Sequence, residues 1–211
     1  MTGSYAAAVA RSIAGWAVVA ALGAALLTGA CARSAPPAAV EPRAGAATER
    51  LLAAARAEER ARRYDRARAL YRQAAREAPD RVSAARAWRE LARALLFWGQ
   101  LTDGEAALRR TVELAPGDVG AWHDLGVVLS QRGDRAGAER ALRRAISLAP
   151  DEPRPRVALG ALLVRERRWR DALVEYRALG RLALPERTRT AVARAIELLE
   201  AEAARERAPR P

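Results

Sequence analysis

The sequence predicts an all-α protein in which pairs of helices follow one another along the chain. Two observations carry this prediction. Alanine is abundant while only 5% of the residues are aromatic, and alanine both favours helices and allows them to pack closely. Residues of one type also recur at a spacing of 34 residues. A β-sandwich would instead need Val, Thr and aromatic residues in strict alternation with polar ones.

The 34-residue period rests on four separate pairs of identical residues. These pairs are Trp88 and Trp122, Leu91 and Leu125, Leu108 and Leu142, and Pro116 and Pro150. Four pairs at one spacing are hard to obtain by chance, and such a period is typical of repeat proteins. Within one period, Gly133 and Asp134 predict a turn and Pro150 cannot continue a helix.

This pattern resembles the tetratricopeptide repeat, a helix-turn-helix unit whose copies stack on one another. The resemblance implies an α-solenoid of four repeats, with residues 82–84 between the first two. The expected repeats span residues 48–81, 85–118, 119–152 and 153–186. The last repeat is degenerate, because it lacks the tryptophan and ends in Leu184-Pro185.

Small and large residues alternate in the way that closely packed helix pairs require. In the third repeat, Gly126 and Ala138 are expected to let the two helices approach, and Leu142 to fill the space between them. Residues 187–207 are expected to form a further helix with an apolar side and a polar side, which would cap the array. Residues 208–211 are expected to be a disordered tail.

The first 30 residues are typical of an export signal. No charged residue lies between Arg11 and Arg33, and an apolar run follows Arg11, as in secretory signals. The end of this run, Gly29-Ala30-Cys31, resembles a bacterial lipoprotein signal. That resemblance implies that residues 1–30 are removed and that Cys31 is lipidated at the start of a Pro/Ala-rich linker, residues 31–47.

Two alternatives for this segment remain open. Cleavage after the A-x-A triplet that ends at Ala32 would release a soluble periplasmic protein. The uncharged run is also about long enough to remain as an uncleaved membrane span. All three hypotheses place the repeats outside the cytoplasm. In lipoproteins of this type, Ala32 after the cysteine favours an outer membrane protein that faces the periplasm.

The charged and reactive residues exclude several classes of function. The net charge is +12 and all 37 basic residues are arginine, but acidic residues are interleaved with them, which indicates solvated helix faces and argues against nucleic acid as a partner. One Cys and one His are too few for a metal site, and we expect no cofactor. No catalytic motif is present, so we expect no enzymatic activity.

The resemblance also implies where a partner binds. Tetratricopeptide arrays bind peptides in a groove lined by the first helix of each repeat. The matching positions here are Arg56, Arg86, Arg89, Arg93, Phe97, His123, Val127 and Arg154, together with Leu52. Arg86, Arg89 and Arg93 would form a basic stripe on one helix face, which suits an acidic partner with an apolar anchor. The alternative is that this stripe is an ordinary solvated surface.

These features together predict a non-enzymatic scaffold for protein–protein interactions, tethered in the bacterial cell envelope by a lipid anchor. An assembly factor for pili or secretion is the specific hypothesis, by analogy with lipoproteins that carry such repeats. One alternative is a periplasmic adaptor that docks or regulates a cell-wall enzyme. Another is self-assembly through the ends of the array.

Overall fold

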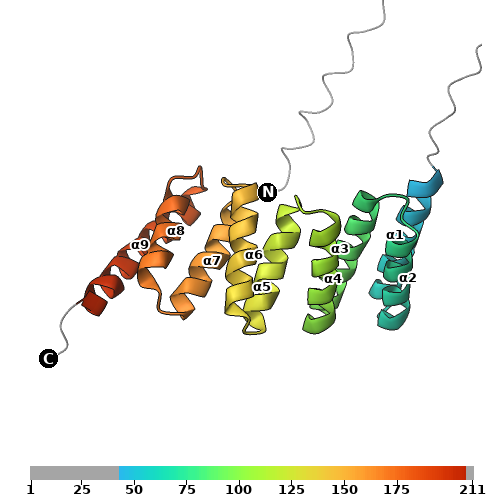
Figure 1. Cartoon of the computed structure of the whole chain (residues 1–211), viewed down its shortest axis with the longest axis horizontal. Coiled ribbons are helices and arrows are strands. Elements are labelled where there is room, and N and C mark those ends of the chain that lie inside the picture. The colour runs from blue at the N-terminus through green and yellow to red at the C-terminus, as the bar shows by residue number, and fades with distance from the viewer. Residues whose placement is uncertain (1–42, 208–211) are drawn as a thin grey trace, which may run out of the picture. The chain divides into compact units, whose positions relative to one another are not determined.

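The computed structural model describes residues 43–207, which are helical apart from short connections and contain no strand. Figure 1 shows the helices lying side by side in the order of the chain. The all-α prediction is confirmed. The predicted signal peptide, Cys31, most of the linker and the tail 208–211 lie outside the described residues.

The helices form four pairs and a last single helix. They are α1 (Arg43–Arg60) and α2 (Tyr64–Arg76), α3 (Arg81–Phe97) and α4 (Leu101–Leu114), α5 (Val119–Gln131) and α6 (Arg135–Leu148), α7 (Pro153–Arg165) and α8 (Trp169–Gly180), then α9 (Glu186–Arg207). Each helix packs on the next, and α1 also contacts α3 while α5 contacts α7. This arrangement is the predicted α-solenoid of four repeats with a C-terminal capping helix.

Two boundaries differ from the prediction. Helix α1 begins at Arg43, although residues through 47 were expected to belong to the linker. The helix starts directly after Pro42, and the alanines that follow are strong helix formers. Residues 82–84 do not form a separate connection but belong to α3, which has 17 residues where α5 has 13. The additional residues therefore add about one turn to a helix.

The additional turn of α3 has its own N-cap. The Asp80 carboxylate accepts a hydrogen bond from the backbone N–H of Ser83 at 2.8 Å and another from the Ser83 hydroxyl at 2.9 Å. These bonds satisfy a backbone donor that the start of a helix leaves unpaired. They also hold the pKa of the Asp80 carboxyl below its usual value, with the backbone bond as the largest cause.

The core of the array consists mainly of Leu and Ala from all four pairs, and close approach within a pair is confirmed. A Cβ atom on Gly126 would lie 2.6 Å from Cγ of Leu142, and one on Gly160 would lie 2.7 Å from Cε2 of Tyr176. Leu142 is only 1% exposed and cannot move away into solvent. Only a residue without a side chain permits this approach.

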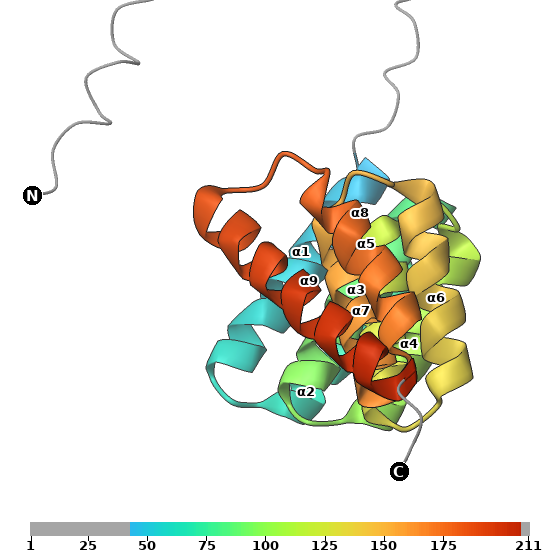
Figure 2. The same cartoon turned by 90° about the vertical axis from the view of Figure 1, so that its left-hand side faces the viewer.

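Helix α9 covers the last pair of the array, as Figure 2 shows from that end. Its residues Val192 and Leu199 are buried, and Val192 packs in a small apolar cluster with Leu179 and Leu184. Arg177 of α8 and Glu200 of α9 form an ion pair at 2.7 Å. The predicted apolar side of the capping helix is therefore the side that packs. No helix in the described part of the chain has the length and apolar character that a membrane span needs.

Arginine also connects neighbouring repeats. Arg168, which precedes α8, contacts Glu139 of α6 at 2.6 Å, and Arg132, which follows α5, contacts Glu105 of α4 at 2.5 Å. Glu105 is only 4% exposed, and Arg109 is its second partner. The planar guanidinium can donate to several carboxylate oxygens at once, so one arginine joins two repeats.

The turn inside each repeat contains one residue with a left-handed backbone. This residue is Arg62 (φ 58°), Gly99 (78°), Gly133 (86°) and Arg167 (58°) in the four repeats in order. Glycine adopts this conformation freely, whereas a side chain is strained there. The two outer repeats therefore contain strain that the two inner repeats avoid.

Adding a side chain at a left-handed position of a turn should lower the stability of the protein, and removing one should raise it. Gly133→Ala should destabilise the protein by about 1 kcal/mol, because the alanine must adopt the left-handed backbone. Arg167→Gly should raise the thermal midpoint, because it relieves the same strain. A Cβ on Gly133 meets no atom within 4 Å, so steric contact does not contribute. Thermal unfolding followed by circular dichroism measures both; equal shifts in the same direction would contradict the backbone explanation.

Candidate functional site

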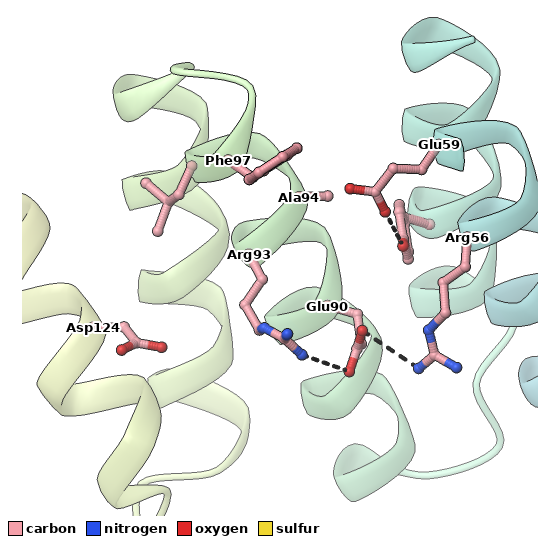
Figure 3. A pocket seen from close by; sticks show the side chains of 9 residues that line it. Arg56, Glu59, Glu90, Arg93, Ala94, Phe97 and Asp124 are labelled. Carbon is pink, nitrogen blue, oxygen red and sulfur yellow. Dashed lines mark hydrogen bonds and ion pairs between the residues drawn. The ribbon is translucent and has the colours of Figure 1, made fainter. Parts of the chain in front are cut away.

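A hollow of about 670 Å³ opens on the face formed by the first helices of the repeats. Helix α1 contributes Arg56 and Glu59, α2 contributes Tyr71, α3 contributes Glu90, Arg93, Ala94, Leu96 and Phe97, and α5 contributes Asp124. Figure 3 shows Arg56 and Glu59 on α1, the lining residues of α3 opposite them, and Asp124 beside α5. We call this site the hollow. Three of the residues predicted for the groove line it, namely Arg56, Arg93 and Phe97.

The hollow has room because Ala94 is small. The residues one and two repeat periods later are the larger Val128 and Leu162, which are each 2% exposed. Ala94 is itself only 4% exposed, so its methyl group forms part of the floor.

Two arginines in the hollow share one carboxylate. Glu90 lies 3.4 Å from Arg56 of α1 and 3.5 Å from Arg93 of its own helix. Figure 3 shows both guanidinium groups directed toward Glu90. Their charge is therefore partly compensated inside the site.

A buried tyrosine holds a second carboxylate in place. The Tyr71 hydroxyl donates a hydrogen bond of 2.9 Å to Glu59, and Tyr71 is only 1% exposed. Burial raises the pKa of the Tyr71 phenol, and the bond to Glu59 and its negative charge raise that pKa further. Tyr71 remains a neutral donor under physiological conditions, and Glu59 is kept at the edge of the hollow.

Phe97 stands at the rim with 82% of its surface exposed. It is the last residue of α3, where the chain turns toward α4. The adjacent Trp98 turns inward and lies 4.9 Å from the ring of Tyr64. Of these neighbouring aromatic residues, Trp98 therefore packs in the protein and Phe97 faces the solvent.

The other predicted groove residues lie outside the hollow. Three of them are arginines in ion pairs: Arg86 with Glu49 at 2.5 Å, Arg89 with Asp118 at 3.1 Å and Arg154 with Glu152 at 2.7 Å. His123 Nδ1 lies 3.0 Å from Asp124. Val127 is half-buried. The predicted basic stripe exists, but each of its arginines has a carboxylate beside it. Leu52 was wrongly expected in the groove, because it is fully buried, with 0% exposure, in the core.

Sequence reasoning missed all three acidic residues of the hollow, Glu59, Glu90 and Asp124. Glu90 and Asp124 both occupy the sixth position of a repeat, where they are spaced by the 34-residue period. Glu59 occupies the twelfth position of the first repeat. Because the twelfth position is one of those that line the groove in the family, the sequence could have indicated Glu59 as a groove residue. Ala94 and Tyr71 could be assigned only as packing residues.

Comparison with known protein families agrees with the geometry. Residues 59–126 match one tetratricopeptide repeat model and residues 119–162 match a second one. The chain is therefore a tetratricopeptide repeat protein. The comparison with curated protein sequences gave no match.

Several solved structures share the fold. A crystal structure of MamA protein aligns with a TM-score of 0.64 and 18% identity, over 76% of this chain and 84% of that one. A second MamA structure, from AMB-1, aligns with a TM-score of 0.58 and 24% identity, over 75% and 83%. YrrB, described as a tetratricopeptide repeat protein with an unusual peptide-binding site, gives 0.57 and 18%, over 72% and 75%. At these identities the similarity establishes the fold.

Proteins of this fold are interaction modules, and the chemistry of the hollow is of the same kind. The hollow offers an apolar ring, an alanine floor and ionised groups of both signs. Within residues 43–207, no group of three or more His, Cys, Asp or Glu is placed to hold a metal ion. The arrangement can bind a side chain or a short segment of another protein.

The environment of Tyr71 predicts a specific response to alkaline pH. Ordinary tyrosines ionise near pH ~10, whereas Tyr71 should remain neutral at that pH. Because Tyr71 ionises first in the unfolded chain, the folded state should lose stability as the pH rises further. Glu59→Gln should lower the pKa of Tyr71, which should stay above the ordinary value because burial is the larger cause.

The ultraviolet absorbance of phenolate measures this ionisation, and subtraction of the Tyr71→Phe titration isolates the contribution of Tyr71. The arginine ion pairs should persist during the titration, because guanidinium remains charged above pH ~12. An unchanged pKa of Tyr71 in the Glu59→Gln variant would show that the hydrogen bond does not form in solution.

Proposed function

We propose that this chain is a non-enzymatic scaffold that holds a segment of a partner protein in the hollow. The family supports this general role, and the position of the hollow on the first-helix face supports the choice of surface. The peptide-binding site named for YrrB is a property of that protein, and here it serves as an analogy.

The observation that carries the proposal is the exposure of Phe97. Leaving a large apolar side chain in water forgoes about 2 kcal/mol of stabilisation that burial would provide. Phe97 is 82% exposed beside a cavity of about 670 Å³, which is within the range of typical ligand sites. A partner that covers Phe97 would recover that stabilisation, and buried aromatic anchors commonly dominate binding.

Two substitutions test the hollow from opposite directions. Ala94→Leu should fill the floor with the residue that the fourth repeat has at the same position, and Phe97→Ala should remove the anchor. Each should weaken partner binding about tenfold or more, which corresponds to about 1.4 kcal/mol. Pull-down of partners from solubilised cell envelopes, followed by titration of the recovered partner, measures the loss.

The matched control is Val174→Ala, because Val174 is also exposed, at 64%, but lies on α8 away from the hollow. This control should retain the same proteins as the natural chain. Circular dichroism should show unchanged helicity for all three variants. Retention of the same partners by Ala94→Leu and Phe97→Ala would rule out the hollow as the binding site.

We further propose that the scaffold is tethered in the cell envelope, most simply as an outer membrane lipoprotein anchored at Cys31. The support for this proposal is the apolar run and the Gly29-Ala30-Cys31 motif. Attachment of several acyl chains to one cysteine would hold the protein firmly at the membrane. The repeats would then bind a partner in the periplasm.

Replacing Cys31 with Ala separates the three hypotheses for the N-terminus. If Cys31 is lipidated, the natural chain should fractionate with membranes and the Cys31→Ala variant should fail to mature as a lipoprotein. Mass spectrometry of the N-terminus should then find lipid on Cys31 in the natural chain alone. A natural chain that begins after Ala32 would indicate a soluble protein, and an intact N-terminus in both chains would indicate a membrane span.

The pathway that the scaffold serves is proposed only by analogy. An assembly factor for pili or secretion should retain secretin or pilus subunits in the pull-down described above. A periplasmic adaptor for cell-wall work should instead retain peptidoglycan enzymes. Recovery of the chain itself as the main partner would favour self-assembly through the ends of the array.

A further inference from the structure

We infer that the end of the hollow between Phe97 and Glu59 binds a basic side chain, Arg or Lys, of the partner segment. This inference rests on the proposed function, because it concerns the ligand of the same hollow. It reverses the acidic partner that the arginine stripe alone predicts.

Each arginine of this face already has a carboxylate beside it. Arg56 and Arg93 share Glu90, at 3.4 Å and 3.5 Å. Arg86 and Arg89, which complete the stripe on α3, pair with Glu49 and Asp118. An acidic segment would have to displace these internal carboxylates before it gained an ion pair.

The hollow contains more carboxylates than guanidinium groups. Glu59, Glu90 and Asp124 line it together with only two arginines. Among the described residues, neither Glu59 nor Asp124 forms an ion pair with an arginine. The Tyr71 hydroxyl binds Glu59 but is uncharged, so the negative charge of Glu59 is not cancelled.

Glu59 and Arg93 extend in different directions relative to Phe97. In Figure 3, Glu59 reaches from α1 toward Ala94 and Phe97, while Arg93 points away from Phe97 toward Glu90. The exposed ring and the carboxylate therefore border the same end of the hollow. A cation gains from both, since it is attracted to the face of an aromatic ring and to an opposite charge.

The shape of the site also suits a long basic side chain. Ala94 leaves space on the floor, and Leu96 adds apolar surface at the wall. The aliphatic stem of Arg or Lys can cover such surface while its charged end stays near water and Glu59. An acidic side chain is short, and it would meet three carboxylates of like charge and only two arginines, both of which already have Glu90 beside them.

A subtractive peptide selection tests this inference. The probe is a phage-displayed library of random peptides, depleted on immobilised Ala94→Leu chain and then selected on the natural full-length chain in detergent at about physiological salt, where non-specific charge effects are screened. We expect selected peptides to be enriched in Arg or Lys beside an apolar residue, and poor in Asp and Glu.

A selected peptide is then titrated against three variants of the full-length chain. Glu59→Gln retains an acceptor for Tyr71 but removes the charge, and Phe97→Leu retains apolar surface but removes the ring. Each should weaken binding about tenfold. Glu113→Gln is the control, because Glu113 is an exposed carboxylate on α4 that pairs with Arg110 away from the hollow. It should leave binding unchanged.

The possible failures are distinguishable. Selected peptides that are acidic, or basic peptides that bind Glu59→Gln as tightly as the natural chain, would overturn the inference and leave the proposed function standing. A selection that yields no peptide preferring the natural chain over Ala94→Leu would overturn both.

Discussion

The structure depends on how closely the two helices of a repeat approach each other. Gly126 faces Leu142 and Gly160 faces Tyr176 at distances that leave no room for a methyl group. A single helix pair exposes apolar faces that only neighbouring pairs can cover. The repeats therefore form a continuous array. Arginine–carboxylate pairs such as Arg168–Glu139 then join one repeat to the next.

The candidate site lies on the face of the first helices, with a small residue on its floor. Ala94 occupies the position at which the later repeats have the larger Val128 and Leu162, and it lines the hollow. The same hollow carries the exposed ring of Phe97 and the carboxylate of Glu59, which has no arginine partner among the described residues. A small residue therefore forms the floor of the hollow, and charged residues of the surrounding first helices determine which side chains the hollow can bind.

The sequence was sufficient to predict the class of fold, because a 34-residue period survives in a single chain, and the capping helix, because its apolar residues recur at helical spacing. It could not predict that the basic stripe is compensated. Arg86 pairs with Glu49 and Arg89 with Asp118, residues 37 and 29 positions away. Such pairs depend on which side chains meet across neighbouring helices, and that information is absent from the pattern of one helix. The additional turn of α3 was missed because three more residues can extend either a loop or a helix.

The two arginines with a left-handed backbone conformation imply an order in which the repeats unfold. Arg62 and Arg167 lie in the first and fourth repeats, whereas the two inner repeats have Gly99 and Gly133 at this point. In a linear array, each unit depends on its own stability and on contacts with adjacent units. The outer units have a strained turn, and the first also lacks a neighbour on one side among the described residues. Fraying should therefore begin at the outer units and move inward, so that hydrogen exchange is slowest in the α3–α6 segment.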